Sequence, residues 1–250
     1  MPKIRIIPIV LTNGTTVVKG KNFDNWRTVG DAKAVANLYS RRNIDELMFL
    51  DVHARKDGKK ISMDLVKKFS EILNIPFSVG GGINTLSEAS EYFRNGAEKV
   101  VLGTAASQDT SLITSIALKY GSQAVTVSID IESCENRRIV TNSGRKITNL
   151  NLQKYVKDLT SAGAGELLLQ NVELEGEMKG YDLELISSVR EMTSLPIIAS
   201  SGCGSAKHAK MAIESGANAV AVGSLFHFTE ITPSSLALDL KSMGFELRRA

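Results

Sequence analysis

Short aliphatic runs alternate with amphipathic segments along the whole chain. Apolar residues spaced by three and four, as in 62–73 and 151–163, are typical of helices that bury one face. The runs between such segments are nearly continuous in Val, Ile and Leu, which is typical of parallel strands buried on both faces. We expect eight strands, near 4–10, 46–51, 76–80, 99–103, 124–130, 166–170, 196–200 and 219–223.

The second half of the chain repeats the first at an offset of 120 residues. The segment 75–106 aligns with 195–226, and one proline and three glycines fall on matching positions. A doubled unit of four strand–helix pairs favours an α/β fold that closes into a (βα)8 TIM barrel, because an open sheet would leave two unpaired edges. A doubly wound open sheet is the alternative. We expect one domain over 1–250, with half-barrels of about 1–122 and 123–250.

The composition narrows the classes of partner. The net charge of +3 is small and dispersed, so it does not indicate nucleic-acid binding; the cluster KDGKK at 56–60 is either a solvated loop or a rim that attracts phosphate. No apolar run reaches the roughly 18 residues of a membrane span, and the first residues lack the pattern of a signal peptide. Cys134 and Cys203 do not make a disulfide framework. We expect a cytoplasmic protein without nucleic-acid or membrane partners.

The sequence does not indicate metal or cofactor chemistry. Its three histidines are dispersed and show no ligand spacing with the cysteines, so we expect no metal and no cofactor. A glutaminase nucleophile would need a G-x-C-x-G elbow, but Gly202 stands immediately before Cys203. The chain therefore has no glutaminase of its own.

Glycine-rich turns follow the third, fourth, seventh and eighth expected strands. Glycine lets an oxyanion approach backbone N–H groups, and neighbouring hydroxyls add donors. One such turn would only be a tight connection, but two pairs related by the repeat indicate two phosphate sites that face each other across the barrel. We call them the first cradle (Gly82, Gly103, Thr104) and the second cradle (Ser201, Gly202, Gly223, Ser224).

A string of motifs in order resembles the cyclase subunit of imidazole glycerol phosphate synthase, the HisF family, over essentially the whole chain. The motifs are RIIP, VVKGKNF, DELMFLD, PFSVGGGI, KVVLGTAA, GSQAV, SID, GAGELLL, GYD, LPIIAS and FHF. The resemblance implies that a separate HisH-like glutaminase releases ammonia, which travels through the barrel to a small phosphorylated substrate at the far mouth. It also implies that Lys19, Asp51 and Gly176 bind substrate.

The resemblance further implies a ring of charged side chains at the barrel end where ammonia enters. The matching positions are Arg5, Glu46, Lys99 and Glu166, which we call the charged ring. Glu98 would lie on the face that docks the glutaminase. Without the resemblance, these charges would indicate only a solvated ring or a salt-bridge network that adds stability.

The catalytic pair of the family is incomplete. Two aspartates are expected at the tips of the first and fifth strands; Asp130 is present, but Leu11 stands at the other tip and has no titratable proton. Gly103 precedes Thr104 where an asparagine is usual. Gln170 and Glu175 replace a hydroxyl and an aspartate.

Three functions follow from this mixture. The interpretation we favour is the branch of the family that supplies ammonia for acetamidino-sugars of bacterial surface polysaccharides, where an ATP-dependent amidotransferase is a further partner, because an apolar residue occupies the same tip there. The first alternative is a working cyclase subunit of histidine biosynthesis in which Asp130 suffices. The second is an inactive scaffold for the glutaminase. Whether the cradles bind two terminal phosphates or one nucleotide diphosphate stays open.

Overall fold

The computed structural model describes residues 3–42, 44–54, 60–133 and 137–248. Cys134 and all of the 56–60 cluster except Lys60 lie outside the described residues. No helix in these ranges is long and apolar enough to cross a lipid bilayer.

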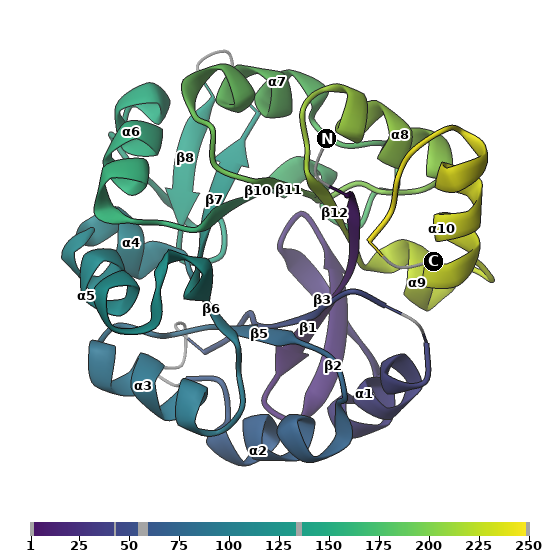
Figure 1. The fold of residues 1–250 in the computed structure, drawn as a ribbon, viewed down its shortest axis with the longest axis horizontal. Coiled ribbons are helices and arrows are strands. Elements are labelled where there is room, and N and C mark those ends of the chain that lie inside the picture. The colour runs from purple at the N-terminus through teal and green to yellow at the C-terminus, as the bar shows by residue number, and fades with distance from the viewer. Residues whose placement is uncertain (1–2, 43, 55–59, 134–136, 249–250) are drawn as a thin grey trace.

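Eight parallel strands close into a barrel, because β10 pairs with β7 as well as with β11 (Figure 1). All eight strands expected from the sequence are present, so the predicted (βα)8 fold is confirmed and the open sheet is wrong. In chain order the barrel strands are β1 (Arg5–Asn13), β4 (Leu47–Asp51), β5 (Phe77–Gly80), β6 (Lys99–Leu102), β7 (Val125–Glu132), β10 (Glu166–Asn171), β11 (Ile197–Ser200) and β12 (Ala219–Val222).

Helices form an outer ring around the barrel (Figure 1). Polar caps set several of their starts: the Ser62 and Asn151 side chains accept the N–H groups of Leu65 and Lys154. The described helices are α1 (Ala32–Ser40), α2 (Met63–Ile72), α3 (Leu86–Arg94), α4 (Thr104–Gln108), α5 (Ser111–Tyr120), α6 (Leu152–Ala162), α7 (Leu183–Met192), α8 (Ala206–Glu214), α9 (Ser224–Phe228) and α10 (Pro233–Ser242), with 3-10 turns η1 (Ser122–Ala124) and η2 (Val172–Leu174).

Two antiparallel hairpins interrupt the alternation, and the sequence did not predict them. The strands β2 (Thr16–Lys21) and β3 (Asp24–Asp31) follow β1, whereas β8 (Arg138–Thr141) and β9 (Lys146–Ile147) follow β7. Their turns lie 120 residues apart and have the same left-handed backbone, with φ of 53° and 56° in the first and 54° and 56° in the second. These turn residues are Asn22–Phe23 and Asn142–Ser143.

The apolar core has two parts. One lies between the barrel wall and the helices, and in it the Phe49 ring of β4 stacks on Phe69 of α2 with centroids 3.6 Å apart. The other fills the inside of the barrel with side chains such as Ile7, Met48 and Leu168. The barrel is therefore packed in its middle, and solvent-accessible sites are confined to its two ends.

Replacing Phe69 with alanine tests the outer core. Phe69 is fully buried, so Phe69→Ala should lower the free energy of unfolding by about 3–5 kcal/mol through lost burial and the cavity left behind. Leu118→Ala is the control, because Leu118 is 84% exposed and its truncation should change stability by less than about 0.5 kcal/mol. Urea denaturation followed by circular dichroism measures both; equal stabilities of the two variants would contradict this packing.

Candidate active site

The side chains that line the barrel axis form one column on each strand, because successive residues of a strand point alternately inward and outward. Side chains two residues apart on a strand point to the same face, so each barrel strand sends every second residue toward the axis. On β1 the column reads Arg5, Ile7, Ile9, Leu11, from a charge at the amino end to an apolar group at the carboxyl end. Four more inward columns, on β4, β6, β7 and β10, are Glu46, Met48 and Leu50; Lys99, Val101 and Gly103; Thr126, Ser128 and Asp130; and Glu166, Leu168 and Gln170.

The four residues of the charged ring meet at the amino ends of the strands. Arg5 donates to Glu46 at 3.1 Å and to Glu166 at 2.7 Å, and Lys99 donates to the same two carboxylates at 2.8 and 2.7 Å. The Thr126 hydroxyl adds a hydrogen bond to Glu166 at 2.9 Å. Each cation thus bridges both anions, and the ring spans the barrel axis.

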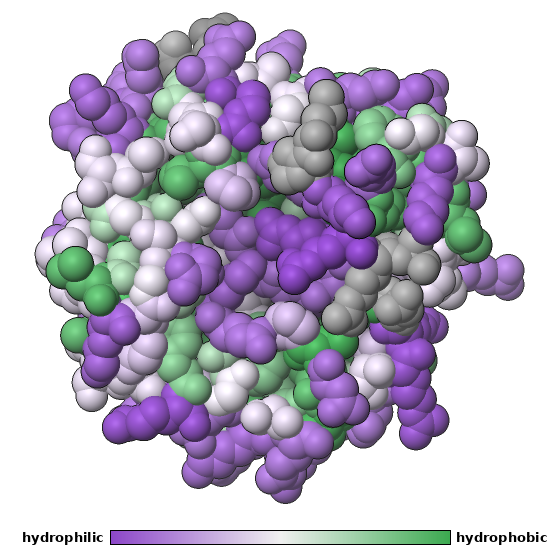
Figure 2. Space-filling view, in the orientation of Figure 1, coloured by the Kyte–Doolittle hydropathy of each residue, from purple (hydrophilic) through white to green (hydrophobic). Residues whose placement is uncertain are grey.

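The ring lies between solvent and the barrel interior. Burial would raise the pKa of Glu166, but Lys99 and Arg5 outweigh burial and the pKa is lowered. Glu46 Oε1 is buried without a hydrogen-bond partner among the described residues. On the outer side the ring borders a cavity of about 300 Å³. Hydrophilic side chains gather over the centre of the strand ring in Figure 2.

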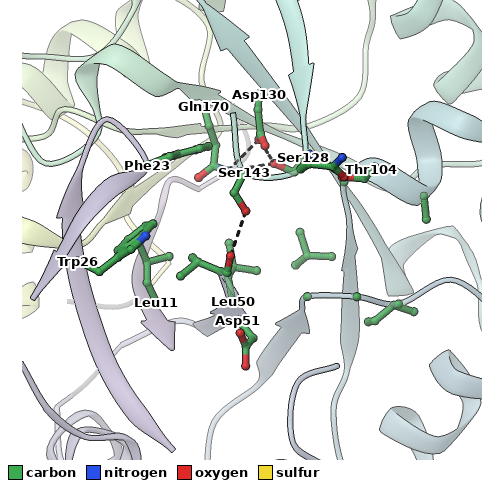
Figure 3. Close-up of a pocket in the computed structure, with 18 residues that line it drawn as sticks. Leu11, Phe23, Trp26, Leu50, Asp51, Thr104, Ser128, Asp130, Ser143 and Gln170 are labelled. Atoms are coloured by element: carbon green, nitrogen blue, oxygen red, sulfur yellow. Dashed lines mark hydrogen bonds between the residues drawn. The ribbon is translucent and has the colours of Figure 1, made fainter. Parts of the chain in front are cut away.

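A second cavity, of about 130 Å³, opens at the carboxyl ends of the strands (Figure 3). It brings together the first cradle, Asp51 and Asp130, as the sequence predicted for a barrel mouth. It also contains residues that the sequence did not single out, Ser128 on β7 and the turn residues Asn142 and Ser143. The full lining is Leu11, Phe23, Trp26, Leu50, Asp51, Val52, Gly81, Gly82, Ile83, Val101, Gly103, Thr104, Ala105, Ser128, Asp130, Asn142, Ser143 and Gln170.

Asp130 is held by two donors on one oxygen. Ser128 Oγ donates to Asp130 Oδ1 at 2.7 Å, and Gln170 Nε2 donates to the same atom at 3.0 Å. The Gln170 carbonyl in turn accepts from the Ser200 hydroxyl at 3.3 Å. Because these bonds end on Oδ1, Oδ2 is the atom left for a bound molecule (Figure 3).

The environment of Asp130 favours proton transfer. Burial raises the pKa of this carboxyl, the hydrogen bonds from Ser128 and Gln170 lower it, and the charge of Glu175 raises it, with a net upward shift. A carboxyl group with a raised pKa is a better proton donor and acceptor near neutral pH than an ordinary aspartate.

Leu11 lies on the wall opposite Asp130. β1 and β7 are separated by three strands in one direction and three in the other, so their tips face each other across the mouth. Leu11 is only 4% exposed and belongs to the apolar cluster inside the barrel, with Leu50 and Trp26 against it (Figure 3). That wall therefore has no proton-transfer group of its own at this tip.

Asp51 has a mainly architectural set of contacts. Its Oδ1 accepts the N–H groups of His53 and Ala54 at 3.0 and 2.9 Å, and its Oδ2 accepts the N–H of Gly14 at 3.2 Å. Burial raises the pKa of Asp51 despite these three bonds. The carboxylate ties the tip of β4 to the turn after β1 while it lines the cavity.

The second cradle is a separate and much smaller space. Ser201, Gly202, Gly223 and Ser224 line it, as predicted, together with Gly176. Its free volume is only about 10 Å³. Lys19, which the resemblance placed at the substrate, lies against Gly223 and pairs with Glu175.

Among the described residues, no group of three His, Cys, Asp or Glu side chains is arranged to bind a metal ion.

Fold and site together define a (βα)8 barrel with a charged ring at one end and a buried acid in a glycine-lined mouth at the other. A family model described as histidine biosynthesis protein matches residues 5–232. The imidazole glycerol phosphate synthase subunit HisF of a Thermotoga species is 44% identical over 98% of this chain and 97% of its own length. The HisF subunits of Thermobifida fusca and Exiguobacterium sibiricum are each 38% identical over 98% of both chains. The chain belongs to the HisF family.

These comparisons do not support the surface-polysaccharide interpretation that the sequence favoured. All three relatives are named as subunits of imidazole glycerol phosphate synthase, and the matching family model is one of histidine biosynthesis. The alternative of a histidine-pathway subunit is better supported. The apolar tip at Leu11 was therefore too weak a signal to assign the branch.

The charged ring should respond to loss of one cation. Lys99→Met leaves two buried carboxylates with Arg5 alone, so the free energy of unfolding at pH 7 should fall by about 3 kcal/mol. The pKa of Glu166 is lowered in the folded state, so its stabilisation is present above the ordinary pKa of Glu and disappears as pH falls through the lowered value. The deficit of the variant should therefore shrink in acid.

Lys68→Met is the matched control, because the Lys68–Glu71 pair is exposed and its loss should cost less than about 0.5 kcal/mol. Denaturant titrations at several pH values measure both variants. A pH-independent deficit in Lys99→Met would contradict the role of the carboxylates.

Gln170 should set the pKa of Asp130. Gln170→Leu removes a donor that favours the carboxylate, so the pKa of Asp130 should rise further, as followed by carbon NMR of the carboxyl group. The variant should be less stable than the wild type at pH 7, and the deficit should shrink as pH falls and Asp130 becomes protonated. In an Asp130→Asn background this pH dependence should vanish. An unchanged Asp130 titration in Gln170→Leu would refute the assignment.

Proposed function

We propose that this chain is the synthase subunit of an imidazole glycerol phosphate synthase, which receives ammonia from a separate glutaminase and uses it on a bisphosphate substrate at the open mouth. The observation that carries the proposal is the shared alignment of the two ends. The charged ring and the lining of the Asp130 pocket share the inward faces of β1, β4, β6 and β10, with apolar side chains between the two ends of each strand. The relatives, named as imidazole glycerol phosphate synthase subunits, support the same reaction.

The proposed route for ammonia follows the barrel axis. A glutaminase docks over the cavity outside the charged ring, on the face that includes Glu98. Neutral ammonia crosses the layer of Ile7, Met48 and Leu168 at little cost, whereas ammonium would lose its hydration there. The ring thus admits ammonia when Lys99 or Arg5 moves aside, and the apolar layer keeps bulk ammonium out.

Asp130 performs the proton transfers at the mouth. Its Oδ2 takes or gives a proton while Ser128 and Gln170 hold Oδ1, and the raised pKa suits both roles near neutral pH. The cradles bind the phosphate ends of the substrate and hold its reacting part beside Asp130. No cofactor is needed for this acid–base chemistry.

One observation favours a second candidate function. Leu11 leaves the wall opposite Asp130 without an acid, and losing one member of an acid–base pair costs roughly 10²–10⁴ in rate. The second candidate is therefore ammonia supply to another phosphorylated acceptor, with an ATP-dependent amidotransferase completing the reaction.

Restoring the missing acid separates the two candidates. With ammonium chloride and the histidine-pathway bisphosphate, the wild type should form imidazole glycerol phosphate slowly and Asp130→Asn should lose this activity. Leu11→Asp should raise the rate by roughly 10²-fold or more, because it supplies the second proton-transfer group.

Leu50→Asp is the control, since Leu50 pairs with Leu11 in register and lines the same cavity but stands on the neighbouring strand. It should give no gain. Product from Leu11→Asp but not from the wild type would favour the second candidate. No product from either protein, with the glutaminase still bound, would refute the cyclase reaction and leave the second candidate and the scaffold.

A further inference from the structure

The second cradle contains an ion pair that belongs to the chain itself. Lys19 Nζ of β2 lies 3.0 Å from Glu175 Oε1 in the turn after η2. The two side chains are only 1% and 8% exposed. A buried pair of this kind is costly to separate, because whichever charge is left alone has lost its water. It occupies the place where a bound anion is expected.

Two contacts fix the pair in the cradle. The terminal methylene of Lys19 lies 2.8 Å from where a Cβ on Gly223 would be, so the lysine fills the space that this glycine leaves open. Ser201 Oγ donates to Glu175 Oε2 at 3.0 Å, so both carboxylate oxygens are held. The free volume left beside the pair is about 10 Å³.

We propose that Glu175 is a specificity-determining residue of the second cradle: an anionic ligand binds there only by taking Lys19 from Glu175. A ligand with one negative charge replaces one carboxylate by another anion of equal charge and gains little. A phosphate monoester carries about −1.5 to −2 charges at pH 7 and interacts more strongly with the ammonium. The second cradle therefore selects a terminal phosphate monoester over a phosphodiester such as the diphosphate linkage of a nucleotide sugar.

This inference rests on the proposed function, because it names the end group of the substrate that the mouth accepts. It favours a substrate with a terminal phosphate at this end.

The hairpin that carries Lys19 stays attached when the pair separates. The N–H of Asn22 donates to the backbone carbonyl of Glu175 at 3.0 Å, and Lys21 pairs with Glu177 at 3.1 Å. Gly176, at φ of 78°, lies so close to the Gly20 carbonyl that a side chain there would clash. Lys19 is therefore held at the cradle by the backbone of the hairpin, and the exchange needs only a change of partner.

Other titratable side chains lie near the Lys19–Glu175 pair, and none of them adds a second positive charge. Burial and, after it, the charge of Lys19 lower the pKa of His227 on α9 to about 4, so it is neutral at pH 7. The charge of Glu175 contributes to the raised pKa values of Asp130 and Tyr181. Among the described side chains that contact this cradle, Lys19 supplies the positive charge.

Binding of two small probes tests the exchange without any catalysis. Methyl phosphate and dimethyl phosphate are titrated at pH 8, where the monoester is a dianion and the diester a monoanion. Backbone amide shifts of Gly202 and Ser224 report on the second cradle, and those of Gly82 and Thr104 on the first. The wild type should bind methyl phosphate at the second cradle at least about tenfold tighter than dimethyl phosphate, because the buried carboxylate competes.

Glu175→Gln should raise the affinity of the second cradle for dimethyl phosphate about tenfold or more and narrow the ratio between the probes, since the competing charge is gone. Glu177→Gln is the matched control. It removes one negative charge two residues away from Glu175 and breaks the ion pair of Glu177 with Lys21 of the hairpin. Because Glu177 does not line the cradle, the affinities for methyl phosphate and dimethyl phosphate should both match those of the wild type. Lys19→Met should abolish binding of both probes at this cradle.

The proposal fails if Glu175→Gln with a native amide spectrum binds dimethyl phosphate no better than the wild type. It fails equally if Glu177→Gln gives the same gain, or if neither probe binds at the second cradle.

These outcomes are independent of the synthase assay. The probes contain no group that reacts with ammonia, so the selection can fail while turnover persists, and turnover can fail while the selection holds.

Discussion

Alternation of side chains along closed parallel strands is the constraint from which the rest of this protein follows. Because every second residue points to the axis, a charge at the start of a strand and a functional group at its tip are joined by one column of intervening side chains. Arg5 and Leu11 are the two ends of one such column, and Glu166 and Gln170 are the ends of another. A shift of one residue in register would turn both ends outward.

The two ends of the barrel satisfy their buried charges in different ways. At the amino ends, two cations and two anions pair with one another, and removing one leaves its neighbours uncompensated. At the carboxyl ends, Asp130 accepts hydrogen bonds from Ser128 and Gln170 but pairs with no cation among the described residues, and burial raises its pKa. The first arrangement suits a closed gate, and the second suits a group that exchanges protons. The Lys19–Glu175 pair combines both features, since it is saturated yet sits where a ligand would offer a better partner.

The barrel could be predicted from the sequence because each of its strands is a short apolar run. Such a run can be recognised without knowing which residues contact it in the fold. The sequence did not predict the two hairpins, since their turns, Asn22–Phe23 and Asn142–Ser143, lack the Asn-Gly pair that marks such turns most clearly. The ion pair of Lys19 with Glu175 joins residues 156 positions apart, so no local sequence pattern predicts it. The roles of the charged ring came from the family resemblance; the structure adds that its members are in direct contact. Leu11 shows a different limit of sequence reasoning. It was the main reason for preferring the surface-polysaccharide branch, although the chain belongs to the HisF family and its relatives are named as histidine-pathway subunits.

Passage of ammonia along the barrel axis is the central claim, and isotope dilution tests it directly. The complex with its glutaminase is supplied with amide-labelled [15N]glutamine, the phosphorylated acceptor and an excess of unlabelled ammonium chloride, and the label in the product is measured by mass spectrometry. If ammonia stays inside the barrel, the product should carry the label of glutamine with little dilution. A product whose label matches the bulk ammonium pool would contradict the account.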